Sequence, residues 1–181
     1  MRARTIMQPG LLLVLLVGCA TRPSEPPPAA EAPMGSASAQ LLDASGRAVA
    51  TASVTETGDA LRVRIEAAGL SAGVYGAHLH SIGQCERPGF ESAGPHWNPA
   101  AREHGRDNPR GQHMGDLPNL LVGTDGRGSF EFTIPGGTLS SGARRLLDAD
   151  GAAVVLHARP DDYRTDPSGN SGARIACGAV G

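Results

Sequence analysis

Apolar and polar residues alternate along several short stretches of this chain, which is the pattern of half-buried β-strands. Residues 61–66 read Leu-Arg-Val-Arg-Ile-Glu, so one face of this segment is apolar and the other is polar. The pattern predicts eight short strands, at residues 38–43, 48–57, 60–67, 74–82, 119–124, 128–134, 152–158 and 174–179. Turn residues such as Gly58-Asp59 and Asp125-Gly126 separate several of them. Strands of this length and spacing favour an antiparallel all-β architecture, either a closed barrel or two packed layers.

Two long stretches interrupt this rhythm. Residues 83–118 and 158–173 are rich in glycine, proline and polar residues and show no strand pattern. Loops of this length inside a compact domain are uncommon, and they usually carry function or are disordered. We therefore expect functional side chains on these two loops, carried by rigid strands.

The N-terminus has the organisation of an export signal. Arg2 and Arg4 precede an apolar run that is far shorter than the ~20 residues of a membrane span. The run ends in Leu-Val-Gly-Cys at 16–19, which resembles the lipobox of bacterial lipoproteins. This resemblance predicts a signal peptide at 1–18 and lipidation of Cys19, and ordinary signal cleavage nearby is the alternative.

A tether and one folded domain follow the signal. Residues 19–38 begin with the cysteine and are rich in proline and alanine, so we expect an extended tether there, and we expect the domain at 39–181. The full chain has a net charge of −2, and loss of the two arginines of the signal peptide makes it −4. All 16 basic residues are arginine, and none forms a basic cluster with interleaved aromatics. Nucleic acid is therefore not an expected partner.

The cysteines indicate a bridge. With Cys19 assigned to the lipobox, Cys85 and Cys177 remain as a pair in an exported protein, where disulfides persist. A bridge between them would close a loop of about 90 residues and contribute roughly 4–5 kcal/mol in the chain-entropy model. Two unpaired buried thiols are the alternative.

All six histidines lie beyond residue 77. His78 and His80 are two residues apart on a predicted strand, so both side chains project from the same face. They form a ready pair of nitrogen ligands for one metal, although this spacing on a strand is more often surface decoration. His157 ends an apolar run and fits a half-buried histidine with a satisfied hydrogen bond equally well.

The first long loop supplies a denser group of metal-binding residue types. His96, His104, His113 and Asp116 fall within about 20 residues of one another. Three imidazoles and one carboxylate make a closed four-coordinate set suited to zinc, and a zinc site with no free position is structural. Imidazoles also suit copper. A solvated side chain is the alternative for each of these histidines.

Five motifs in a fixed order make the sequence similar to copper–zinc superoxide dismutases. They are Gly-Ala-His-Leu-His at 76–80, Ser-Ala-Gly-Pro-His-Trp-Asn-Pro at 92–99, His-Met-Gly-Asp at 113–116, Val-Leu-His at 155–157 and Gly-Asn-Ser-Gly-Ala-Arg-Ile-Ala-Cys-Gly at 169–178. The similarity runs from about residue 38 to the C-terminus, and the combination is highly specific. It implies an all-β, eight-stranded Greek-key β-barrel, sandwich-like in its packing, with two long functional loops; this family is itself a standard example of that architecture.

The resemblance implies a two-metal site that uses every histidine. Copper is expected to be bound by His78, His80, His96 and His157. Zinc is expected to be bound by His96, His104, His113 and Asp116. The ring of His96 then bridges the two ions as an imidazolate. Asp161 holds the position of an outer aspartate that links a copper ligand to a zinc ligand by hydrogen bonds.

The implied reaction is dismutation of superoxide to O₂ and hydrogen peroxide, by one-electron cycling of copper beside a structural zinc. Arg174 matches the family's channel arginine, which steers and hydrogen-bonds the anion, and together with His96 it is the expected catalytic pair. Arg159 and Arg164 are candidates for strengthening the attraction, although well-known members carry lysine in this loop. Cys85 and Cys177 occupy the family's disulfide positions.

The export signal and the resemblance together predict a lipid-anchored enzyme on the periplasmic side of a bacterial envelope, with the outer membrane favoured by the alanine after Cys19. Family members pair through different barrel faces, so a homodimer is compatible with the sequence, but its interface is not predicted. A copper-handling module without turnover and a vestigial structural protein are the competing functions. The complete set of six histidines and Arg174 disfavours both.

Overall fold

The computed structural model describes residues 34–181. The predicted signal peptide, Cys19 and most of the predicted tether lie outside the described residues. Within the described part of the chain, no helix is long and apolar enough to cross a membrane.

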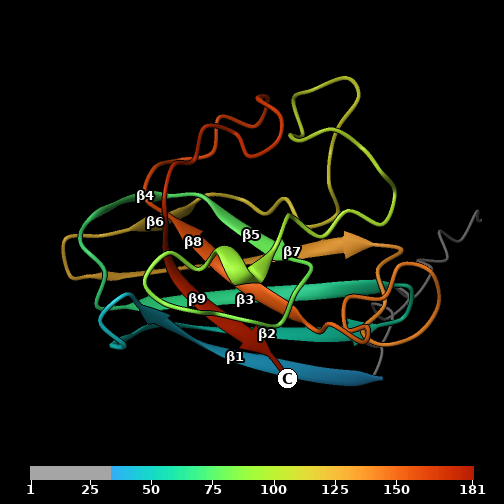
Figure 1. Cartoon of the computed structure of the whole chain (residues 1–181), viewed down its shortest axis with the longest axis horizontal. Helices are drawn as coiled ribbons and strands as arrows, with labels where there is room; N and C mark the ends of the chain where they lie inside the picture. Colours follow the sequence, from blue (N-terminus) through green and yellow to red (C-terminus); the bar gives the residue numbers. More distant parts are fainter. Residues whose placement is uncertain (1–33) are drawn as a thin grey trace, which may run out of the picture. The chain divides into compact units, whose positions relative to one another are not determined.

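Nine β-strands build the domain (Figure 1). They are β1 (Gly35–Asp43), β2 (Ala48–Thr57), β3 (Ala60–Ala68), β4 (Gly73–Tyr75), β5 (Ala77–His80), β6 (Leu120–Val122), β7 (Arg127–Pro135), β8 (Ala152–His157) and β9 (Arg174–Val180). Seven form one curled antiparallel sheet in the order β5-β8-β9-β1-β2-β3-β7, and β4 pairs with β6 in a separate ribbon. Strands that are distant in sequence, such as β1 and β9, lie side by side. Apart from the short 3-10 turn η1 (Glu91–Ala93), residues 34–181 contain no helix, so the all-β prediction is confirmed.

The first strand begins three residues earlier than its predicted start at residue 38. Residues 35–38, which their composition placed in the tether, pair with β2, with Gly35 opposite Glu56. Ala37 and Ala39 point into the core, while Ser36 and Ser38 face outward. Alanine and serine are both small, and the segment continues a stretch rich in the same residues, so this alternation did not stand out in the sequence.

The strand predicted at 74–82 is divided at Gly76. Before the glycine, β4 pairs with β6, and after it β5 pairs with β8. A Cβ atom at Gly76 would lie 2.9 Å from the Cβ of Ser171 and 3.2 Å from the carbonyl oxygen of Arg159. The chain therefore changes sheets where only glycine fits against the second long loop.

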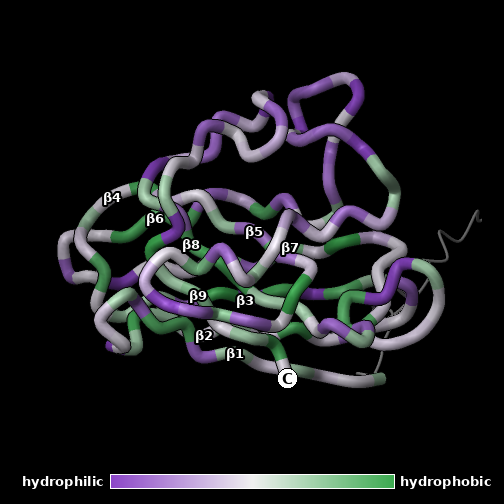
Figure 2. Tube along the Cα trace, in the orientation of Figure 1, coloured by the Kyte–Doolittle hydropathy of each residue, from purple (hydrophilic) through white to green (hydrophobic). Residues whose placement is uncertain are grey.

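The core lies between the curved sheet and the ribbon and is built from aliphatic side chains. Leu41, Val54, Leu61 and Ile65 have no exposed surface. Every residue of β5 and β8 is buried, which sets these two strands apart from the alternating burial of β3. Figure 2 shows hydrophobic segments along the strands and mostly hydrophilic segments on the long loops. The side chains of β5 and β8 thus start from the most enclosed part of the domain.

The second long loop and the later part of the first lie side by side at the top of the view in Figure 1. The main-chain N–H of Asp107 donates to the carbonyl of Tyr163 at 3.0 Å, which joins the loops directly. The first loop is also tied to the last strand by the disulfide Cys85–Cys177, with a Cα–Cα distance of 5.6 Å. The predicted bridge is confirmed, and it holds one end of the first loop against β9.

Candidate metal centre

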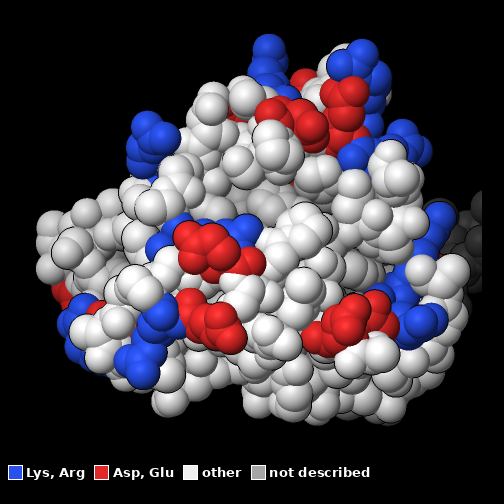
Figure 3. Space-filling model, viewed as in Figure 1, with Lys and Arg blue, Asp and Glu red and all other residues white. Residues whose placement is uncertain are grey.

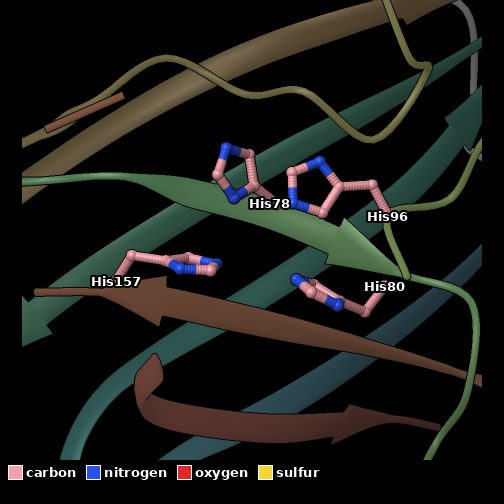
Figure 4. Close-up of side chains that lie close together, drawn as sticks. All are labelled: His78, His80, His96 and His157. Carbon is pink, nitrogen blue, oxygen red and sulfur yellow. The ribbon is translucent and has the colours of Figure 1, made fainter. Parts of the chain in front are cut away.

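Four histidine rings converge on one buried space (Figure 4). His78 and His80 lie on β5, His157 ends the neighbouring β8, and His96 lies on the first long loop opposite His80. Each contributes a donor atom that lies within 4.8 Å of those of the other three. All four side chains are buried. The structure thus brings together the four histidines that the resemblance implies for copper.

Hydrogen bonds determine which ring nitrogen faces this space. His80 donates from Nδ1 to the carbonyl of Gly94 at 2.9 Å, and His157 donates from Nδ1 to the carbonyl of Gly172 at 3.1 Å. His78 donates from Nε2 to the carboxylate described below. The opposite nitrogens of these three rings are buried and have no hydrogen-bond partner within residues 34–181. A neutral imidazole that donates from one nitrogen presents a lone pair on the other, and such buried lone pairs without partners fit a bound metal.

A second cluster surrounds one carboxylate oxygen. Asp116 Oδ1 lies 3.0 Å from Nδ1 of both His96 and His104. It also lies 3.2 Å from Nδ1 of His113, which is 3.3 Å from Nδ1 of His96. Ligand atoms 2.0–2.1 Å from a tetrahedral zinc are about 3.3 Å apart, so these spacings match a zinc cage. His104 Nδ1 faces the carboxylate without hydrogen-bond orientation and has no other partner in the described range, as expected for an atom directed at an ion.

The ring of His96 lies between the two clusters. Its Nδ1 faces Asp116 and His113, so its Nε2 is the atom left for the first cluster. It stacks on the ring of His78 with a centroid distance of 4.0 Å and an interplanar angle of 29°. Donor atoms of His78, His96, His104 and Asp116 also lie within 4.8 Å of one another, so the two clusters touch. One imidazole can therefore serve two ions.

Asp161 connects the two clusters by hydrogen bonds to the outer nitrogen of one histidine in each. Its Oδ2 accepts from Nε2 of His78 at 2.8 Å, and its Oδ1 accepts from Nε2 of His104 at 3.0 Å. The carboxylate side chain is fully buried. Because both rings donate from Nε2, both present Nδ1 to the clusters. This carboxylate thus orients one ring of each set.

Burial and nearby negative charge shift the pKa values of the histidines in opposite directions. Burial lowers the pKa of His78 to about 3 and that of His157 to about 4, and it also lowers the pKa of His80 and of His96. For His104 burial alone would lower the pKa, but hydrogen bonds and negative charge from two aspartates outweigh it and raise the pKa to about 9. The first cluster is therefore a set of neutral imidazoles, which is the form that binds metals.

The carboxylates remain ionised. Burial alone would raise the pKa of Asp116, but close contacts with the ring nitrogens of His104, His113 and His96 lower it far below its ordinary range. Asp161 shows the same balance, and the bonds from His104 and His78 lower its pKa. Two buried negative charges therefore face the histidines of the second cluster, which favours a cation there.

An open pocket of about 810 Å³ reaches the two clusters from solvent, and its lining includes His96, His157 and Arg174. Arg174 is held by two bonds, from Nη1 to the carbonyl of Phe90 and from Nη2 to the carbonyl of Gly94, each 2.7 Å long. Burial lowers the pKa of this guanidinium. The group is thus fixed beside the histidine rings and places a positive charge on the wall of the pocket.

Two further arginines line the same pocket, Arg102 and Arg145. The main chain at Arg145 is anchored because its carbonyl accepts from Nε1 of Trp97 at 3.0 Å. Arg159 and Arg164, the candidates from the sequence, do not line this pocket, and Arg164 lines a separate one. The sequence held no signal for the two pocket arginines, because both lie outside the matching motifs and only folding brings them to the site.

Comparisons with known proteins place these residues in context. Residues 44–180 match the family profile of copper/zinc superoxide dismutase (SODC). The superoxide dismutase-like protein YojM of Bacillus subtilis is 46% identical over 144 residues, which cover 78% of this chain and 74% of that protein. A copper–zinc superoxide dismutase of Caulobacter vibrioides is 40% identical over 148 residues, covering 80% of this chain and 85% of the relative.

Solved structures show the same similarity. A SOD-like protein from Bacillus subtilis has a TM-score of 0.74 and 45% identity, covering 78% of this chain and 96% of the other. A variant of that protein, in which a proline is replaced by histidine, has the same TM-score of 0.74. The clock protein EA4 has a TM-score of 0.68 and 30% identity, covering 81% of this chain and 93% of the other.

Proposed function

Because the chain belongs to the copper/zinc superoxide dismutase family, we propose that it binds one copper and one zinc ion and dismutates superoxide outside the cytoplasm. The single observation that carries this proposal is the ring of His96. It lies between three buried histidines with unpaired nitrogens and a carboxylate-centred cage of zinc dimensions.

The ligand sets follow from the free donor atoms. We assign copper to Nδ1 of His78, Nε2 of His80, Nε2 of His96 and Nε2 of His157. We assign zinc to Nδ1 of His96, His104 and His113 and to Oδ1 of Asp116. The second set would supply four ligands and leave no open position, so a zinc ion held there would be structural.

The chemistry that copper supplies when bound is one-electron exchange, in which one superoxide is oxidised to O₂ and another is reduced and protonated to hydrogen peroxide. The protein's own contribution begins with Arg174, whose fixed guanidinium attracts and orients the anion in the pocket. His96 contributes Nε2, which holds a proton when it is not engaged as a ligand. Its Nδ1 lies 3.0 Å from Asp116 in the second cluster, which would hold the ring in place while Nε2 carries a proton.

Net negative charge does not prevent the capture of an anion. Acidic and basic side chains are interspersed on the face shown in Figure 3, so the local field at the pocket matters more than the total charge. Local fields of this kind can raise association rates by about 10–10³, and superoxide dismutase is itself a standard example of the effect. The pocket wall carries three arginines against two aspartates, Asp148 and Asp166, and Arg174 is the arginine fixed beside the histidine rings, which supports this interpretation.

The location is part of the proposal. The export signal, the lipobox-like sequence and the disulfide all fit a protein on the periplasmic side of a bacterial envelope, tethered through lipid on Cys19. Mass spectrometry of the mature protein tests this, with Cys19→Ser as the unlipidated control. A mature chain that begins elsewhere, or a lipid-free Cys19, contradicts the anchor without affecting the metal sites.

A copper-handling module without turnover is the second candidate, because one relative with 46% identity is described only as superoxide dismutase-like. Copper and zinc contents of the exported protein, measured together with superoxide turnover, separate the two functions. We expect one ion of each kind per chain and turnover that falls as salt rises. A fully loaded protein without turnover would favour the second candidate, and a protein that takes up neither ion would exclude both.

A further inference from the structure

Asn119 contacts the main chain of Asp161 on both of its polar sides. It follows the first long loop and immediately precedes β6. Its Nδ2 donates to the carbonyl of Asp161 at 2.9 Å, and its Oδ1 accepts from the N–H of Asp161 at 2.8 Å. The two bonds close a ring in which the side-chain amide pairs with one residue as a neighbouring strand would. Among the described hydrogen bonds, this amide is the partner of both main-chain groups of Asp161.

The same residue holds the second long loop at another point. The main-chain N–H of Asn119 donates to the hydroxyl of Tyr163 at 2.8 Å. The ring of Tyr163 is covered by the guanidinium of Arg106, with Cζ 3.8 Å from the ring centroid. The carbonyl of Tyr163 accepts from the N–H of Asp107. Asn119, at the start of β6, therefore binds the second loop at two residues, Asp161 and Tyr163.

The hydrogen bonds from Asn119 fix the main chain of Asp161, whose carboxylate contacts one histidine of each cluster. Asp161 reaches His78 at 2.8 Å and His104 at 3.0 Å, so its backbone position sets the orientation of a ring in each metal set. An asparagine suits the role because its planar amide offers a donor and an acceptor side by side. An aspartate at residue 119 would lack the donor, and alanine would lack both groups.

We propose that Asn119 is a positioning residue of the two-metal site, which acts by fixing Asp161 and through it the rings of His78 and His104. The inference rests on the proposed metal sites. Outer residues that orient metal ligands typically change metal affinity by about 10–100-fold when they are lost. Because Asp161 itself remains in an Asn119 variant, we expect an effect at the lower end of this range.

The test is zinc affinity of the copper-free mature protein, measured by competition with a chelator. Asn119→Ala should weaken zinc binding by about tenfold, and Asp161→Ala by more. In the Asp161→Ala background, Asn119→Ala should cause no further loss, because the path to the ligands is already broken. The isosteric Asn119→Asp keeps the shape but replaces the amide donor by a carboxylate oxygen that faces the carbonyl of Asp161, so it should also weaken zinc binding, and it covers the case in which the alanine variant does not fold.

A matched control removes two hydrogen bonds in the same loop that do not reach Asp161. The hydroxyl of Thr165 donates to Asp162 at 2.7 Å and accepts from Asn170 at 3.2 Å, so Thr165→Val should leave zinc affinity within about twofold of the parent. Unchanged affinity in both Asn119 variants, or losses that add fully to those of Asp161→Ala, would overturn the inference. A parent protein that binds no zinc would instead remove the proposed metal sites and the inference with them.

Discussion

The two halves of the candidate metal centre are built differently. Three members of the copper-side set, His78, His80 and His157, come from paired strands, and every residue of those strands is buried. All members of the zinc-side set come from the first long loop, which has no regular strand of its own. The strand-borne half is fixed by main-chain register, which follows from the sheet itself. The loop-borne half depends on contacts that tie the loop to other parts of the domain.

These ties can be identified. The disulfide Cys85–Cys177 joins the loop to β9, Asp161 joins it to β5, and Asn119 holds Asp161 in place. From this comparison we expect that removing one of these contacts disturbs the zinc-side half more than the copper-side half. It also predicts that changes to strand-borne ligands are local and leave the loop intact. The experiments below test this division, beginning with the largest expected effect.

The first variant removes the disulfide, which among these contacts joins the residues that lie farthest apart in the sequence. The double variant Cys85→Ala/Cys177→Ala should lose about 4 kcal/mol of unfolding free energy, or about a thousandfold in the folding equilibrium, because the unfolded chain gains the freedom of a long loop. Denaturant unfolding of the metal-free protein measures the change. Cys19→Ser, which removes the cysteine outside the bridge, is the control and should unfold like the parent. An unfolding free energy that equals the parent's would show that the bridge does not support the loop.

One ligand from each half gives the most direct contrast. His157→Ala should reduce superoxide turnover by more than about a hundredfold, since even outer residues around a metal cost 10–100-fold, while zinc stays bound. His104→Ala should release zinc and reduce stability, while part of the turnover remains. Metal analysis, turnover and thermal unfolding of both variants decide the matter. Zinc loss in the strand variant together with retained zinc in the loop variant would reverse the proposed division.

Charge reversal at Arg174 tests the pocket. Arg174→Glu should lower the bimolecular rate with superoxide by about 10–100-fold and weaken its dependence on salt, because the attractive field at the pocket is lost. Arg174→Lys keeps the charge but not the two bonds to Phe90 and Gly94, so it separates attraction from anchoring. Turnover measured at several ionic strengths is the readout. A rate unchanged by Arg174→Glu would remove this residue from the mechanism.

The smallest effect is expected at the outer pocket wall. Arg145→Glu should lower the rate by about twofold to fivefold, since an exposed charge is partly screened by salt. Arg164→Glu is the matched control, because this arginine lines a different pocket, and it should change the rate much less. Equal effects from the two variants would mean that total charge, and not position on the pocket wall, controls the capture of the anion.

Much of the site could be predicted because residue types and short sequence spacings identify its metal-binding groups. His78 and His80 share a face because strand side chains alternate, and the group from His96 to Asp116 contains the donors of a zinc cage in one loop. The disulfide pair was predicted because Cys85 and Cys177 were the cysteines left for an exported domain. The strands were predicted from alternation, except where small residues hid the start of β1 and where Gly76 divided one strand between two sheets.

The sequence by itself therefore determined the fold class, the donor atoms available and the order in which the chain presents them. The tertiary structure decided which distant residues meet. The pairing of β5 with β8 brings His157 to His78, the closing of two loops places Asp161 between His78 and His104, and the pocket gathers Arg102 and Arg145. Contacts between residues far apart in the chain depend on register, loop closure and packing of the whole domain. None of these is encoded in a local spacing: the contacts of His157 and Asp161 could be expected only through the resemblance to a known family, and those of Arg102 and Arg145 only from the folded molecule.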